Sequence, residues 1–95
     1  MKKVVTAQIV EIALQALDPT AERQIRAWFS SLQRWDEDPE LRRNSVLLEG
    51  VPGVYFLRTT TDIRIFFRID GDTITVLDVT TRQAILASGS VSEPK

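Results

Sequence analysis

The spacing of hydrophobic residues is helical in the first half of the chain and alternating in the second. One helical segment is defined by five large apolar residues: Ile25, Trp28, Phe29, Leu32 and Trp35. Their spacing of three or four predicts a helix whose apolar side packs on a core. Asp18 is a suitable N-cap for this helix, and Pro19 fits the first helical position, where its missing N–H costs nothing. We expect the helix to end near the segment DEDPE, residues 36–40.

Residues 4–17 fit both kinds of spacing. Alternation predicts a strand from Val4 to Thr6. The same region contains a set at helical spacing: Val5, Ile9, Ile12, Ala13 and Ala16. We therefore expect a short strand that leads directly into a helix.

From residue 54 the spacing is that of strands. VYFLR and IRIFFRI flank the segment TTTD, and Asp70-Gly71 joins the second of these strands to TITVLDV. An Asp-Gly pair favours a type I′ hairpin turn, which needs positive φ at both central positions. The prediction is a single α+β domain over residues 1–95, with two N-terminal helices packed on one face of a small, mainly antiparallel sheet.

Alternation also divides the side chains of this sheet between its two faces. The face expected to meet the helices carries Tyr55, Leu57, Ile63, Ile65, Phe67, Ile69, Ile74 and Val76. The opposite face, here called the arginine face, carries Phe56, Arg58, Arg64, Phe66, Arg68, Thr73 and Thr75. Arg82 follows the third strand and is expected at the end of the same face. Alternation thus explains how arginines are tolerated within the most hydrophobic strand.

Such a face has two interpretations. Guanidinium groups stay protonated and present forked donors that match phosphate oxygens, and aromatic rings beside them stack on unpaired bases. The alternative is a solvated outer surface, with Phe66 covered by the stems of the arginines. Composition alone does not separate them, because charged outer faces are common in antiparallel sheets.

Composition limits the available chemistry. The chain has no cysteine and no histidine, which excludes disulfides, thiolate chemistry, zinc sites built on those residues and imidazole-dependent triads. Asp70 and Asp72 flank one glycine and are expected to form a turn, because they lack a complete set of metal ligands. We expect no cofactor or metal, a cytoplasmic location, and fraying of the last eight residues, SGSVSEPK.

Charge and hydropathy add two constraints. The formal net charge is −1, so that binding a polyanion requires a local basic surface. No apolar run approaches the roughly 18 residues of a membrane span, and we expect no membrane partner. The N-terminal segment up to Leu17 is interrupted by Gln8, Glu11 and Gln15, and is interpreted as part of the fold.

The segment LLEGVPGVYFLRTTTDIRIFFRIDGDTITVLDVTTRQAI resembles the second half of the RelE/ParE superfamily of toxins from bacterial toxin–antitoxin pairs. The resemblance spans roughly residues 47–86. The matching features occur in a fixed order. The Leu-x-Gly-x-Pro-Gly turn comes first, and a strand that contains tyrosine and ends in arginine follows it. The next strand is opened by an aspartate, a bulky residue and an arginine, and after it come the ID-D hairpin and a third strand ending in arginine. The preceding helices agree in type only.

The resemblance implies a toxin with an antitoxin partner encoded nearby. In the RNase branch of the family, messenger RNA on the ribosome lies on the open sheet face, and a 2′-hydroxyl attacks the adjacent phosphate in a metal-independent transesterification. Carried over by position, Arg58, Arg64 and Arg82 are the expected catalytic residues, acting as electrostatic stabilisers of the developing charge. Phe56, Phe66 and Arg68 are the expected residues that bind RNA or a partner.

Two positions depart from the RNase pattern. Phe56 stands where the strongest RNases have a lysine, and Leu86 stands where a C-terminal tyrosine is usual. Arginine does not readily act as a base, and Tyr55 is expected on the core face. Three functions therefore remain open: a weak RelE-like mRNA endonuclease that inhibits translation, a ParE-like toxin that binds DNA gyrase, and a degenerate family member that only binds a protein partner.

Overall fold

The computed structural model describes residues 1–81 and has three helices and five strands within that range. Along the chain these are β1 (Lys3–Thr6), α1 (Gln8–Gln15), α2 (Pro19–Leu32), α3 (Pro39–Arg43), β2 (Ser45–Leu47), β3 (Val54–Arg58), β4 (Ile63–Asp70) and β5 (Thr73–Thr81). Arg82, Leu86 and the C-terminal segment SGSVSEPK lie outside the described residues. The predicted α+β class is confirmed, whereas α3 and β2 were not predicted.

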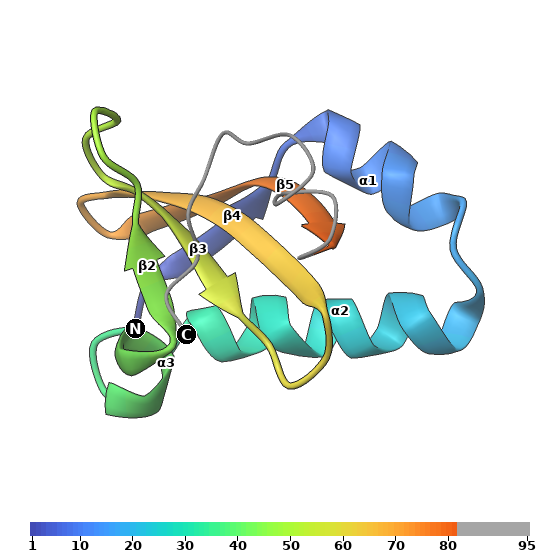
Figure 1. Ribbon diagram of the computed structural model, residues 1–95, viewed down its shortest axis with the longest axis horizontal. Helices are drawn as coiled ribbons and strands as arrows, with labels where there is room; N and C mark the ends of the chain where they lie inside the picture. Colours follow the sequence, from blue (N-terminus) through green and yellow to red (C-terminus); the bar gives the residue numbers. More distant parts are fainter. Residues whose placement is uncertain (82–95) are drawn as a thin grey trace.

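The sheet has the order β1-β5-β4-β3-β2, and Figure 1 shows α1 and α2 beside it, joined by a loop at the far end of the molecule. The pairs β2–β3, β3–β4 and β4–β5 are antiparallel, and only β1 pairs in parallel, with β5. The prediction of a mainly antiparallel sheet is therefore confirmed. Within the described residues no helix is long and apolar enough to cross a membrane.

Helix α2 begins as its sequence predicts. The Asp18 carboxylate accepts hydrogen bonds from the backbone N–H groups of Thr20 and Ala21, at 2.9 and 3.0 Å, and Pro19 opens the helix. The helix ends at Leu32, a little before the predicted segment. Asp38 instead caps α3 by accepting from the N–H of Glu40 at 3.0 Å, so part of DEDPE begins a second helix.

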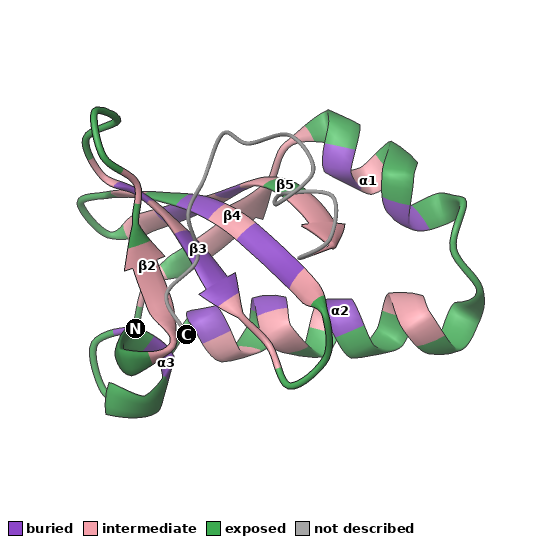
Figure 2. Cartoon of the chain, in the orientation of Figure 1, coloured by how far each residue is buried: buried purple, intermediate pink, exposed green. Residues whose placement is uncertain are grey.

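The core lies between the helices and one face of the sheet, and buried residues follow β3 and β4 in Figure 2. Every sheet residue predicted for the core face belongs to this cluster or packs against it: Tyr55, Leu57, Ile63, Ile65, Phe67, Ile69, Ile74 and Val76. Trp35, Tyr55 and Phe67 form an aromatic trio with ring centres 5.4–5.6 Å apart. Such contacts contribute about 0.5–1.5 kcal/mol each beyond the area they bury.

Helix α1 turns a different side to the core from the one its spacing suggested. Val10 and Leu14 are buried, whereas Ile9 and Ile12 are 68% and 61% exposed. The helix is apolar on both sides, so the periodicity could not show which side faces inward. Burial of Val10 and Leu14 follows from the backbone of Ala7, whose N–H bonds to the carbonyl of Val76 at 2.9 Å and fixes where the helix leaves the sheet.

The β4–β5 hairpin differs from its prediction by one residue. Asp70 pairs with Thr73, so that the loop is Gly71-Asp72, and only Gly71 has positive φ (59°). Glycine alone at the first central position is the pattern of a type II′ turn, not type I′. Moving the loop by one residue shifts the pairing of the two strands by two residues. Because side chains alternate with a period of two, Ile74 and Val76 stay on the predicted face.

Substitutions in this turn test its type. Gly71→Ala should lower the free energy of unfolding by about 1–2 kcal/mol, because an L side chain is strained at positive φ. Asp72→Gly should destabilise by about 0.4–1 kcal/mol through the added freedom of the unfolded chain. Urea denaturation measures both values. A type I′ turn would make Asp72→Gly stabilising, which would contradict this assignment.

One charged network joins the two long helices. Arg26 of α2 bonds to Glu22 at 2.8 Å and reaches Glu11 of α1 with two hydrogen bonds of 2.8 and 3.3 Å. The hydrogen bonds from Arg26 are the main cause that lowers the pKa of Glu11 in the folded protein. These carboxylates likewise raise the pKa of the Arg26 guanidinium.

Because the pKa of Glu11 is lowered on folding, its stabilising effect is full above its unfolded value and is lost as the pH falls through the folded value. Between pH 7 and pH 3, the melting temperature of wild type should therefore fall more than that of Glu11→Gln. Thermal unfolding followed by circular dichroism across this range measures the difference. Parallel curves for the two proteins would contradict a contribution from the ionised Glu11.

Candidate functional site: the arginine face of the sheet

The sheet register arranges the residues of the arginine face in rows that cross the strands. One row runs Thr80–Arg64–Arg58 and the next runs Asp78–Phe66–Phe56–Val46. A third row runs Val5–Thr75–Arg68–Val54, and the last, beside the hairpin, runs Lys3–Thr73–Asp70. The predicted division of β3 and β4 between two faces is confirmed, since none of these residues belongs to the core cluster.

Arg58 and Arg64 lie directly opposite each other in neighbouring strands. Side chains in such a pair have Cβ atoms about 4.5–5.5 Å apart, so both guanidinium groups belong to the same part of the arginine face. The pair is therefore a suitable site for a phosphate or carboxylate group.

Arg64 is more buried than its predicted position on an open face implies. It is only 7% exposed, and its Nη1 donates hydrogen bonds of 2.9 Å to the carbonyl oxygens of Thr61 and Ile63. The Thr59 hydroxyl holds this loop by donating to the carbonyl of Ile63 at 2.9 Å. Charged hydrogen bonds to these carbonyls offset part of the cost of burying the guanidinium and fix its position at the start of β4.

The two aromatic rings of this face pack against each other. Phe56 and Phe66 are opposite one another in the sheet, with ring centres 5.6 Å apart and planes tilted by 34°. Phe56 has no exposed surface, so the expectation that both rings are open to a ligand is wrong for Phe56. Phe66 is partly exposed and Arg68 is exposed, as predicted. Of the two rings, Phe66 is the one available for stacking.

A β-bulge in β5 adds a residue that sequence reasoning missed. The register of β4 against β5 shifts between Phe66 and Phe67, so that Phe67 pairs with Val76 whereas Phe66 pairs with Asp78. Strict alternation from Ile74 and Val76 would put Asp78 on the core face. The extra residue, Leu77, instead brings an exposed carboxylate beside Phe66 on the arginine face. The only sequence signal for this shift is an aspartate in an otherwise core-facing series.

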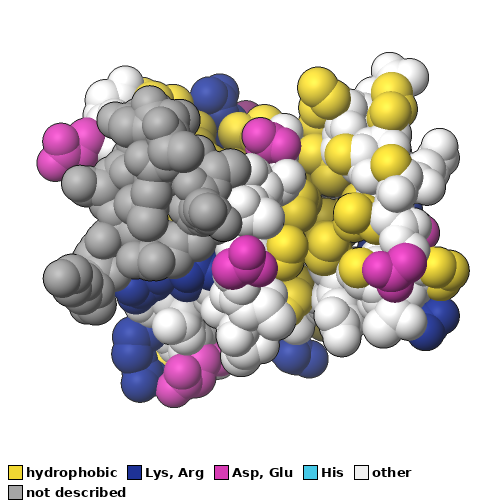
Figure 3. Space-filling model, turned by 45° about the vertical axis from the view of Figure 1, so that its right-hand side comes forward, with side chains coloured by type: hydrophobic (Ala, Val, Ile, Leu, Met, Phe, Trp, Pro, Cys, Tyr) yellow, Lys and Arg dark blue, Asp and Glu magenta, His cyan; other side chains and the backbone are white. Residues whose placement is uncertain are grey.

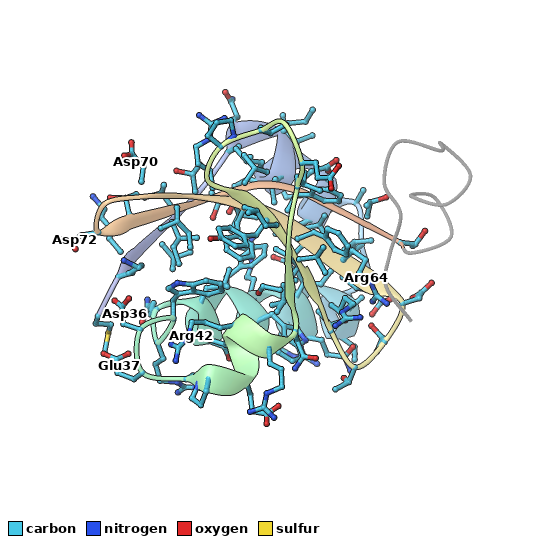
Figure 4. All side chains as sticks on the ribbon, turned by 60° about the vertical axis from the view of Figure 1, so that its left-hand side comes forward. Asp36, Glu37, Arg42, Arg64, Asp70 and Asp72 are labelled. Carbon is cyan, nitrogen blue, oxygen red and sulfur yellow. The ribbon has the colours of Figure 1, made fainter. Side chains whose placement is uncertain are left out.

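The remaining predicted features have structural roles. Tyr55 lies on the core face, in contact with Trp35 and Phe67. In the acidic segment, Asp36 lies 3.6 Å from Lys2, and Glu37 lies 3.8 Å from the N-terminal amine. Figure 4 shows both beside the N-terminal strand, below the hairpin that carries Asp70 and Asp72. The described part of the chain holds no cluster of three or more residues suited to bind a metal.

A second surface is apolar and lies on the side of the helices. Figure 3 shows hydrophobic side chains gathered there. Exposed Leu17 borders a cavity of about 370 Å³, which is also lined by Ile25, Trp28, Thr61 and Ile63. Large exposed apolar areas commonly mark contacts with other proteins.

Comparison with solved structures places this arrangement in a known fold. The RelB–RelE antitoxin–toxin complex from Methanococcus jannaschii matches with a TM-score of 0.65 and 19% identity, over 88% of this chain and 96% of the other. The archaeal RelE–RelB complex from Pyrococcus horikoshii OT3 matches with a TM-score of 0.66 and 23% identity, over 85% and 94%. The intact E. coli RelBE complex matches with a TM-score of 0.63 and 18% identity, over 85% and 96%.

The chain therefore has the RelE fold, as the resemblance implied. No protein-family model matches the sequence, and no curated protein matches it by sequence. The likeness to these solved structures is one of backbone arrangement, at 18–23% sequence identity.

The opposed arginines can be tested as an anion site. Wild type should gain more in melting temperature from sulfate than from chloride at equal ionic strength, and Arg58→Gln should lose most of this excess. Arg34→Gln removes the same charge from an exposed position after α2 and serves as the control. Equal sulfate responses in all three proteins would leave only the general effect of sulfate on hydration and would contradict an anion site.

Proposed function

We propose that this chain is the toxin of a toxin–antitoxin pair and that it cleaves messenger RNA through its arginine face. The observation that carries the proposal is the cross-strand pair Arg58–Arg64 on the face opposite the helices, with Phe66 in the next row. A phosphate bound by the arginines lies one row from a ring on which a base can stack. Along the strand this separation is about 6.6–6.8 Å, or two residues of rise.

The chemistry of the pair suits a phosphoryl transition state. Attack by a 2′-hydroxyl places additional negative charge on the phosphate oxygens, and guanidinium groups held by fixed hydrogen bonds need little reorganisation to stabilise it. Arg64 meets this condition through its bonds to the carbonyls of Thr61 and Ile63. Arg82 stays a proposed member of this set.

An antitoxin partner is the second part of the proposal. RelE is bound to RelB in several of the solved structures that share this fold. In this chain, Ile9, Ile12 and Leu17 expose 41–68% of their surface, and Leu17 also borders the cavity between α2 and the β3–β4 loop. An apolar surface of this kind on a small domain favours a protein partner that covers it.

A ParE-like action on DNA gyrase is the competing function. It is favoured by the buried Phe56 at the position where the strongest RNases have lysine, and by the net charge of −1, which does not promote docking on a ribosome. Both functions predict growth inhibition. They differ in the macromolecule whose synthesis stops first.

The test is a short pulse of expression in bacterial cells, followed by incorporation of labelled methionine and labelled thymidine. We expect methionine incorporation to fall first and Arg58→Gln/Arg64→Gln to restore it, because the anion site is lost. Arg34→Gln should inhibit like wild type. An early fall in thymidine incorporation would indicate gyrase instead, and no change in either would contradict a toxin function.

A further inference from the structure

We propose that Asp78 is the proton acceptor of the arginine face, taking the proton from the RNA 2′-hydroxyl as it attacks the phosphate. This inference rests on the proposed RNase function and adds a catalytic residue to it. It answers the main chemical difficulty of that function, which is that the expected site contains arginines, rings and hydroxyls but no group that readily accepts a proton.

The position of Asp78 follows from the bulge in β5. Asp78 pairs with Phe66, and Thr80, two residues further along β5, pairs with Arg64. Asp78 is therefore the diagonal neighbour of Arg64, at a distance of about 7–8 Å between Cα atoms, which long side chains and a bound nucleotide can bridge. The carboxylate thus borders both the proposed phosphate site and the exposed ring.

Two other candidates for this role, Tyr55 and Asp70, are excluded by their places in the sheet. In the two rows that contain the opposed arginines and the rings, Asp78 is the only carboxylate among the described residues. Tyr55 lies on the core face. Asp70 shares the arginine face but lies at the hairpin end of β4, far from Arg64, as Figure 4 shows.

The carboxylate is also oriented. Its Oδ1 accepts a hydrogen bond of 2.8 Å from the backbone N–H of Val79, and the residue is exposed. This bond holds the side chain beside the bulge and uses one of its two carboxylate oxygens. The cations nearest to it in the sheet register are Arg64 and Arg68 of β4, with Arg58 of β3 beyond Arg64.

The step balances without a metal or a redox partner. A bond forms between the 2′-oxygen and phosphorus while the bond from phosphorus to the 5′-oxygen breaks. The 2′-hydroxyl proton passes to Asp78, and the 5′-oxygen takes a proton from water. The products are a 2′,3′-cyclic phosphate and a 5′-hydroxyl end, and Asp78 then returns its proton to solvent.

The experiment compares wild type and Asp78→Asn, as full-length chains, on a defined messenger RNA bound to purified bacterial ribosomes. Asparagine keeps an oxygen that can accept from Val79 but cannot take a proton. We expect kcat to fall by about 10²–10⁴-fold at pH 7. KM should stay equal or decrease, because a negative charge is removed near the phosphate. The loss should shrink at higher pH, where hydroxide replaces the carboxylate.

Asp70→Asn is the matched control, since it removes the same charge from the same face outside the two central rows. It should cleave like wild type. If Asp78→Asn cleaves as fast as wild type or faster, Asp78 only repels the phosphate and the inference is wrong. If wild type cleaves no RNA, or if its cleavage products carry no 2′,3′-cyclic phosphate, the proposed function itself fails, and the inference with it.

Folding is separated from catalysis by a second variant. Asp78→Glu retains the carboxylate and should retain more activity than Asp78→Asn, even where its longer side chain perturbs the bulge. Melting temperatures of both variants are measured alongside. If activity in the two variants correlates with their melting temperatures and not with the presence of a carboxylate at position 78, the assignment is wrong.

Discussion

The two-residue period of β4 is the constraint on which the rest of the structure depends. Ile65 and Phe67 must face the helices to complete the core, and both are fully buried there. The backbone then has no choice about Arg64, Phe66 and Arg68, which turn to the opposite face. One strand therefore closes the core and builds the basic surface at the same time. A slip of one residue in its pairing would bury the arginines and expose the core residues together.

The bulge in β5 adds a carboxylate to the arginine face. Ile74 and Val76 face the core, and strict alternation would put Asp78 there next. Because Leu77 is an extra residue, Val79 packs against the core instead, and Asp78 and Thr80 turn to the arginine face. The packing of the core is preserved, because Ile65 still meets an apolar partner in β5. Bulges are often found beside functional sites, where they redirect single side chains. Here the side chain redirected is the carboxylate beside Phe66.

Burial of Arg64 is the main energetic cost of this face. Arg64 retains little exposed surface, and burying a guanidinium group costs free energy unless it is hydrogen-bonded. Its hydrogen bonds to the carbonyls of the β3–β4 loop offset part of this cost and fix the group before any ligand arrives. The exposed apolar side chains of α1 form a separate surface, and such a surface favours contact with another protein.

Local patterns were sufficient for much of this fold. The cap at Asp18, the apolar side of α2 and the alternation in β3 and β4 depend on neighbouring residues, and the sequence alone determined them together with the placement of Arg58, Arg64 and Arg68. Other features depend on contacts between distant segments. The inward side of α1 was set by its junction with β5, the type II′ turn by the pairing of Asp70 with Thr73, and the burial of Phe56 by packing. The position of Asp78 belongs to this second group, because a bulge is visible only when two strands are paired.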